Sequence, residues 1–219
     1  MKIAYEEILK NEKIKTYIKK ADESLRALGY TEHSFPHVMK VADTASEILS
    51  TLGFSDEEAE LAKIAGYLHD IGNVVNRVGH AQSGAVMAFR ILNEMEMDTE
   101  DVATIITAIG NHDESTAFPV NNVAAALMLA DKADVRYTRV RNDDTTTFDI
   151  HDRVNYSVKE TYMEMKKGSH IELSLTIDTS VCSVMDYFEI FLNRMLLCRK
   201  AAEKLGVEFR LRINSQRML

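Results

Sequence analysis

Residues 68–73 read LHDIGN, and the His69-Asp70 pair inside this stretch closes a predicted helix. Adjacent residues of a helix diverge by about 100°, so both side chains reach one ion only at an irregular helix end or through a carboxylate that swings round. Gly72, just beyond the pair, favours such an end. The pair is therefore positioned to hold a metal ion where the helix stops.

Four more metal-type side chains fall, by helical spacing, on the apolar faces of other predicted helices. His37 lies one turn before Val41 and points inward. His80 opens one helical segment, and His112 closes another. Asp131 falls on the core side of a very apolar helix, where an unpaired carboxylate would be costly to bury.

Each of these side chains also has a purely structural explanation. A single inward histidine is more often a core residue hydrogen-bonded to a carbonyl than a ligand. Asp131 could cap a helix or pair with Lys132 or Arg136. As a set, however, six such groups aimed into one core are most simply explained by a bound cation. The candidate ligands are His37, His69, Asp70, His80, His112 and Asp131.

The order of these residues resembles that of the HD superfamily of metal-dependent phosphohydrolases. The resemblance covers roughly residues 30–140 and is carried by LHDIGN, GHAQSGA, IGNHDE and LADKAD. It implies an HD-type all-helical bundle and a phosphoric ester hydrolase. By the same resemblance, a first metal ion takes His37, His69, Asp70 and Asp131, and a second takes Asp70, His80 and His112, with Asp70 bridging the two.

Phosphoester chemistry suits such a site. Two cations about 3.5–4 Å apart can clamp a phosphoryl group, activate a bridging water as the nucleophile and neutralise charge on the leaving oxygen. Mixed imidazole and carboxylate ligands suit Mn, Fe, Co, Ni or Zn better than Mg. We therefore expect one or two divalent transition-metal ions per chain, and a phosphomonoester or a nucleotide as the substrate.

The sequence departs from many relatives at Asn73, because a lysine directly follows HDIG in those proteins. Another acid must then donate to the leaving group, and the nearest candidates are Asp113, Glu114 and Lys132. Each of these charges could equally lie exposed on a loop or a helix face. We predict Asp70, Lys132 and Asp113 as the catalytic residues.

Basic residues around the motifs predict where the substrate binds. Arg77, Lys132 and Arg136 carry groups that recognise phosphate, and His33 lies four residues before His37 near the expected mouth of the site. Alternatively, Lys132 and Arg136 form a solvated helix face, and His33 faces solvent. We predict that Arg77, Lys132, Arg136 and His33 bind substrate.

Two other classes of function stay open at this stage. Some HD relatives use the same order of ligands to bind a mixed-valent iron pair that activates oxygen, so the chain could be a diiron oxygenase. It could also be a non-catalytic nucleotide or metabolite sensor that retains the metal pocket. Iron content and oxygen consumption distinguish the first alternative, and tight binding without turnover distinguishes the second.

Composition indicates an ordinary globular protein. The chain has 219 residues, of which 46% are hydrophobic and 27% charged. Its formal net charge of -8 argues against general nucleic-acid binding and against binding to acidic membranes. The sequence has neither an apolar run of signal-peptide length nor a spanning segment, so we expect a cytoplasmic protein. Cys182 and Cys198 fit reduced packing residues.

Hydrophobic periodicity divides the chain into a helical metal-binding domain, residues 1–148, and a small α+β appendage, residues 149–219. Apolar residues alternate over 171–177 and 207–213, which predicts half-buried strands. An earlier strand is expected to start near Val154 and to form a hairpin, and residues 184–205 have helical spacing.

The appendage is thus a strand-strand-helix-strand unit with an exposed sheet edge. That edge could pair with a twin in a homodimer, or the unit could fold over the helical domain as a lid or bind a small-molecule effector. Its histidines, His151 and His170, are expected at the surface.

Overall fold

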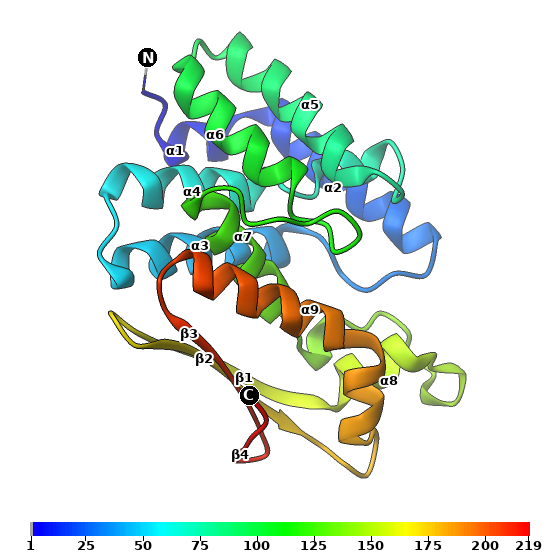
Figure 1. Cartoon of the computed structure of the whole chain (residues 1–219). Helices are drawn as coiled ribbons and strands as arrows, with labels where there is room; N and C mark the ends of the chain where they lie inside the picture. Colours follow the sequence, from blue (N-terminus) through cyan, green and yellow to red (C-terminus); the bar gives the residue numbers. More distant parts are fainter. Residues whose placement is uncertain (1) are drawn as a thin grey trace.

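The computed structural model describes residues 2–219, with a helical N-terminal part followed by a small sheet and two helices (Figure 1). This confirms the predicted fold class, mainly α with a C-terminal α+β unit. The helices of the first part are α1 (Tyr5–Lys10), α2 (Glu12–Ala27), α3 (Phe35–Leu52), α4 (Asp56–Leu68), α5 (His80–Glu94), α6 (Thr99–Gly110) and α7 (Asn122–Ala133), with the 3-10 turn η1 (Ile71–Val74) between α4 and α5.

The ends of these helices follow from local side chains. Ser55 Oγ accepts the backbone N–H of Glu58 at 3.2 Å, and the Glu58 side chain reaches back, so a capping box starts α4. Asn121 Oδ1 accepts a backbone N–H at 2.7 Å at the start of α7. Helix α3 ends at Gly53, whose φ of 87° lies in the left-handed region.

Helix α7 lies at the centre of the helical part. It packs against α3, α4 and α6, and also against the later helix α9. All residues from 123 to 130 are buried, so this helix is apolar on every side. Its last turn therefore carries Asp131 into the interior.

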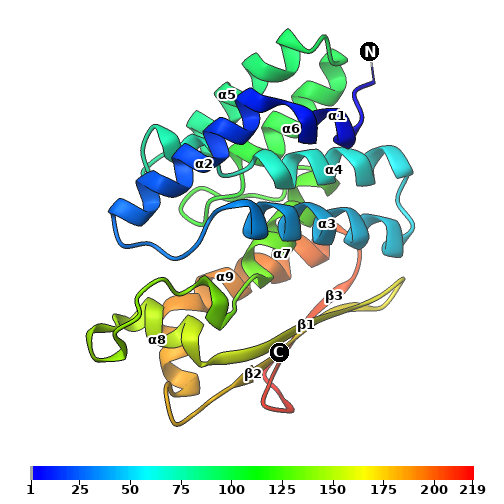
Figure 2. The same ribbon diagram turned by 180° about the vertical axis from the view of Figure 1, so that it is seen from behind.

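The C-terminal unit is a sheet with the order β1-β2-β3-β4. Strands β1 and β2 are antiparallel, β2 and β3 are parallel, and β3 and β4 are antiparallel. Helix α9 contacts β2, β3 and α7, so it joins the sheet to the helical part (Figures 1 and 2). The elements of this part are η2 (Tyr137–Arg139), η3 (Thr145–Thr147), α8 (Ile150–Ser157), β1 (Val158–Lys166), β2 (His170–Ile177), α9 (Val184–Lys204), β3 (Glu208–Ile213) and β4 (Gln216–Arg217).

The predicted first strand is wrong at its start, because residues 150–157 form a helix. Asp149 caps this helix by accepting the backbone N–H of Asp152 at 2.8 Å. Val154 is buried as a helical residue, and the ring of Tyr156 packs edge-on against Phe148. The apparent alternation therefore spans the end of a helix and the beginning of a strand. The hairpin of β1 and β2 itself is confirmed.

The buried apolar residues of both parts belong to one continuous core. A division at residue 148 accordingly stays a prediction. Strand β1 lies at one edge of the sheet, and pairing of two chains through this edge also stays a prediction. Every helix within residues 2–219 is too short or too polar to serve as a membrane-spanning segment.

Gly72 brings the LHDIGN turn against the start of α5. A Cβ atom at this position would lie 2.0 Å from the carbonyl oxygen of His80 and 2.4 Å from the backbone nitrogen of Gly84. Backbone atoms at both positions leave no space for a side chain. Gly72 is therefore needed for this close approach, which sets His80 beside Asp70, and not for a left-handed helix end.

We expect Gly72→Ala to lower the free energy of unfolding by about 1–3 kcal/mol, because the added methyl group forces the two backbones apart. Urea denaturation followed by circular dichroism measures the change. Gly110→Ala is the matched control, since its Cβ would lie 3.6 Å from the nearest atom, in ordinary contact. Equal unfolding midpoints for the two variants would contradict this account of the turn.

Candidate metal centre

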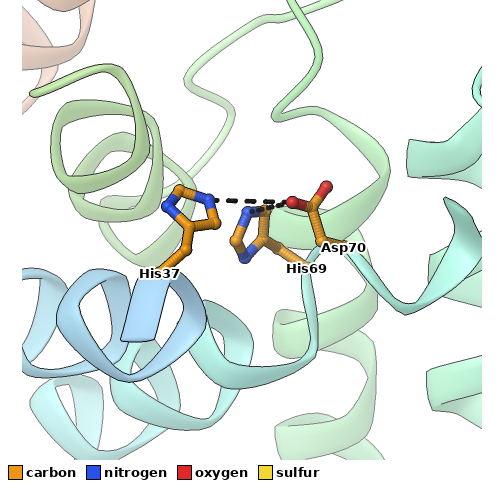
Figure 3. A group of neighbouring side chains, drawn as sticks. All are labelled: His37, His69 and Asp70. Carbon is orange, nitrogen blue, oxygen red and sulfur yellow. Dashed lines mark ion pairs between the residues drawn. The ribbon is translucent and has the colours of Figure 1, made fainter. Parts of the chain in front are cut away.

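The first group of candidate ligands comes from two consecutive helices and the turn after them. His37 lies in the first turn of α3, His69 caps the C-terminus of α4, and Asp70 precedes η1. In Figure 3, both imidazoles point toward one oxygen of Asp70. Asp70 Oδ2 lies 3.7 Å from His37 Nε2 and 3.3 Å from His69 Nε2. All three ligand atoms lie within 4.8 Å of one another.

The other oxygen of Asp70 faces a second pair of histidines. His80, the first residue of α5, has its Nε2 atom 3.6 Å from Asp70 Oδ1, and His112, just after α6, has its Nε2 atom 4.0 Å from the same oxygen. Asp131 of α7 lies with the first group of ligands, and its Oδ1 atom is 3.5 Å from His37 Nε2. The carboxylate of Asp70 thus lies between two sets of ligand atoms.

Every one of the four histidines has its Nδ1 atom engaged. His69, His80 and His112 each direct Nδ1 to the backbone carbonyl three residues earlier, at 2.8, 2.9 and 2.6 Å respectively. His37 directs Nδ1 to Asp134 Oδ2 at 2.8 Å. A ring held through Nδ1 presents the lone pair of Nε2 on its opposite side, as in metal sites whose ligands are oriented by a hydrogen bond.

Asp134 was not predicted from the sequence as part of the site. It is buried, and it also pairs with Lys40 at 3.1 Å and with Arg136 at 2.8 Å. Its position in LADKAD could have predicted this role, because Asp134 follows Asp131 by three residues and residues three apart lie on the same face of a helix. Asp134 positions His37 rather than offering a ligand atom of its own.

Two features test whether this arrangement fits a metal ion. Among the residues described, His37 Nε2 is buried without a hydrogen-bond partner. In addition, His80 Nε2 and His112 Nε2 face each other at 3.1 Å although both rings direct Nδ1 elsewhere. Two acceptor lone pairs at that separation repel unless a proton or a cation lies between them. The donor set therefore fits divalent cations.

The two carboxylates of the cluster are ionised. Burial raises the pKa of Asp70, but His69 and the other nearby histidines outweigh burial, and the pKa lies well below its usual value. Burial also raises the pKa of Asp131, but Lys132 and two histidines outweigh burial and hold this pKa well below its usual value. Ionised carboxylates are the form that binds a metal ion.

Two histidines of the cluster are neutral at pH 7. Burial lowers the pKa of His112 to about 3, and burial also lowers the pKa of His80. At His69, burial is outweighed by Asp70 and Asp131, which raise its pKa. A cation would compete with the proton on His69, because the same carboxylates stabilise both.

Comparison with known proteins finds one match to a family model. Residues 35–136 match the model of the HD domain. This segment of the chain is an HD domain. A protein of Methanocaldococcus jannaschii described as uncharacterized is 25% identical over 212 residues, which cover 84% of this chain and 81% of that protein. The crystal structure of a predicted HD superfamily hydrolase from an uncultured Thermotogales bacterium is 28% identical, covers 57% of this chain and 67% of that chain, and has a TM-score of 0.45.

The HD match and the histidine and aspartate groups together support a metal-dependent hydrolase in general terms. The identified segment contains all six candidate ligands. It ends before α8, so the C-terminal unit lies outside the HD domain.

Four of the six candidate ligands, namely Asp70, His80, His112 and Asp131, line a cavity of about 600 Å³. Arg77 lies close to the ligands, with Nη1 3.3 Å from Asn73 Oδ1 and 3.4 Å from His80 Nε2. The Lys132 ammonium donates to Asp131 Oδ2 at 2.5 Å. The predicted catalytic and substrate-binding residues that line this cavity are Asp70, His33, Arg77, Lys132 and Asp113.

Arg136 is the one predicted substrate-binding residue that the structure does not bring to the cavity lining. It is absent from the lining formed by the described residues. Its guanidinium is used elsewhere, with Nε donating to Asp134 Oδ1 at 2.8 Å and Nη2 lying 3.3 Å from Glu32 Oε2. Arg139 lines the cavity instead, and it donates to the backbone carbonyls of Glu32 and Asp134 at 2.9 and 2.8 Å.

Asp113 lines the cavity but is poorly suited to act as an acid. Burial raises its pKa, but the hydrogen bond from Ser115 and nearby positive groups lower it below the usual value. A general acid must carry a proton before it donates one. Asn73, which replaces the lysine of many relatives, donates to Asp70 Oδ1 at 2.8 Å and so helps to orient that carboxylate.

The appendage contributes more to the site than its sequence suggested. Asn155 and His151 of α8, and Phe191 and Arg194 of α9, line the same cavity. The surface prediction for His170 is wrong, since its side chain is buried beside Ser169. No local pattern marks the residues of α8 and α9, because only the packing of α9 on α7 brings them to the ligands.

We expect Asp134→Asn to weaken metal binding by about tenfold or more, because a neutral amide holds the His37 ring in position less firmly than the carboxylate does. Calorimetric titration of the metal-free protein with Mn or Co measures the affinity. Asp43→Asn, an exposed change in the same helical part, should leave the affinity unchanged. Unchanged affinity in Asp134→Asn would show that His37 needs no such support.

Proposed function

We propose that this protein is a metal-dependent phosphohydrolase that cleaves a phosphomonoester or a nucleotide with two divalent transition-metal ions. The observation that carries the proposal is the position of Asp70, whose two oxygens face separate sets of imidazole Nε2 atoms. The first ion would be held by His37, His69, Asp70 and Asp131, since Asp131 Oδ1 lies 3.5 Å from His37 Nε2 and 3.8 Å from His69 Nε2. The second ion would be held by Asp70, His80 and His112.

When bound, such ions supply Lewis acidity, which activates water and neutralises the charge of a phosphoryl group. The chain itself supplies ionised carboxylates and imidazole lone pairs that already converge, so little reorganisation is needed on binding. The buried position of the ligands excludes bulk water from all sides except the cavity. A substrate phosphate therefore has one direction of approach.

Two basic side chains, Arg77 and Lys132, are placed to bind that phosphate. Arg77 lies beside His80 and Asp70 at the cavity wall, and its planar guanidinium suits two oxygens of one phosphate. Lys132 is buried at the same wall and is held by Asp131. We assign Lys132 to donate a hydrogen bond to the leaving oxygen, because Asn73 cannot supply a charged donor and Asp113 is ionised.

Purified protein with Mn or Co should hydrolyse a generic phosphomonoester or at least one nucleotide of a panel. Asp70→Ala should lower kcat by at least about a hundredfold, because the change removes the carboxylate shared by both sets of ligand atoms. Release of inorganic phosphate measures turnover.

Asp43→Ala serves as the matched control, since Asp43 is an exposed carboxylate of α3 that pairs with Lys63. It should retain full turnover. Metal-dependent oxygen consumption without phosphate release would contradict the proposal, and so would full turnover in Asp70→Ala.

A further inference from the structure

The cavity beside the metal centre has a second wall that comes from the C-terminal unit. Helix α8 contributes Asn155, and helix α9 contributes Phe191 and Arg194. These residues line the same cavity as Asp70 and Lys132. The space in front of the candidate ligands is thus completed by a part of the chain that lies outside the HD domain.

Arg194 is the cation of this second wall. Its guanidinium carbon lies 4.3 Å from the centre of the Phe191 ring, and its Nε atom forms an ion pair with Glu114. Glu114 lies two residues after His112. The pair therefore links α9 to the loop that carries a candidate ligand, and the stacked ring limits how the guanidinium can turn.

The four lysine and arginine side chains that line the cavity differ in which groups their N–H donors already bind. Arg139 donates to two backbone carbonyls, Lys132 to a carboxylate at 2.5 Å, and Arg77 to a side-chain amide at 3.3 Å. In contrast, no hydrogen bond joins the terminal nitrogens of Arg194 to another residue of the described chain, and its Nε atom is engaged only in the ion pair with Glu114. Arg194 keeps donors available for a ligand.

The acidic residues of the second wall are already engaged. Asp149 caps α8 by accepting a backbone N–H at 2.8 Å, and Asp152 accepts from Asn142 at 3.4 Å. Both carboxylates would repel an anion placed along α8. An anionic group in this part of the cavity is therefore favoured beside Arg194.

We infer that the substrate carries a second anionic group, separate from the phosphate that is hydrolysed, and that Arg194 binds this second group. The inference rests on the proposed function, because it takes the scissile phosphate to lie beside the candidate metal ligands. The second group is a phosphate or a carboxylate, which a guanidinium binds through two parallel hydrogen bonds. The cavity of about 600 Å³ has room for both anionic groups and the part that links them.

Calorimetric titration of the Mn-loaded protein with non-hydrolysable ligands tests this inference. The probes are alkyl monophosphonates and bisphosphonates with linkers of increasing length. We expect at least one bisphosphonate to bind about tenfold tighter than the monophosphonate of the same chain length, because it gains charge-assisted hydrogen bonds. Phosphonocarboxylates of the same lengths then show whether the second group is better as a phosphate or as a carboxylate.

Arg194→Gln should weaken the best bisphosphonate about tenfold and the monophosphonate much less. Glu114→Gln should bind the bisphosphonate at least as tightly as the unmodified protein, because it releases Arg194 from its ion pair. Arg90→Gln is the matched control, since Arg90 is exposed on α5 and pairs with Glu94. It should keep the full preference for the bisphosphonate. Thermal melts verify that each variant is folded.

Two kinds of failure are distinguishable. If the unmodified protein binds monophosphonates but no bisphosphonate binds tighter, or if Arg194→Gln weakens both series equally, the inference is overturned and the proposed function stands. If monophosphonates fail to bind, or bind equally well without the metal ion, the proposed function is overturned together with the inference.

Discussion

Each imidazole of the site is held by one hydrogen bond at Nδ1, and the direction of its Nε2 atom depends on that bond. Three of the four bonds use the carbonyl three residues earlier. Such carbonyls lack a helical partner at the C-termini of α4 and α6, beside His69 and His112, and in the turn before α5, which begins at His80. His37 lies in the first turn of a continuing helix, so it depends on the distant carboxylate of Asp134. Helix ends thus determine both the fold around the site and its chemistry.

A cluster of this kind is unfavourable inside an apolar core unless its charges are balanced. Asp70 and Asp131 are ionised, and the rings of His80 and His112 approach each other through acceptor atoms. Divalent ions between these groups would satisfy both kinds of atom together. The close approach permitted by Gly72 is part of the same arrangement, because it sets the start of α5 against the LHDIGN turn. The cavity then leaves one side of the cluster open to a ligand.

Helical spacing in the sequence predicted which polar side chains face the interior, and the structure brings all six candidate ligands together. It did so because His37, His80 and Asp131 lie on inward faces of their helices, and because His69, Asp70 and His112 follow directly after helices whose apolar faces point to the same place. Asp134 was overlooked although its spacing from Asp131 was informative. Arg136 was expected at the cavity, but a nearby carboxylate pair holds it elsewhere. No pattern in the sequence marks Arg194, since only the packing of α9 against α7 brings it to the cavity. Val154 was assigned to a strand because apolar residues can also alternate for a few positions where a helix ends and a strand begins.

The most direct measurement is anomalous diffraction at the Mn absorption edge from crystals grown with that metal. Two peaks are expected in each chain, one among His37, His69 and Asp131 and the other against His80 and His112, with Asp70 contacting both. Each ion should lie roughly 2.0–2.3 Å from the Nε2 atoms that bind it. A single peak, or ions bound away from these Nε2 atoms, would contradict the account of a paired metal centre built on the two oxygens of Asp70.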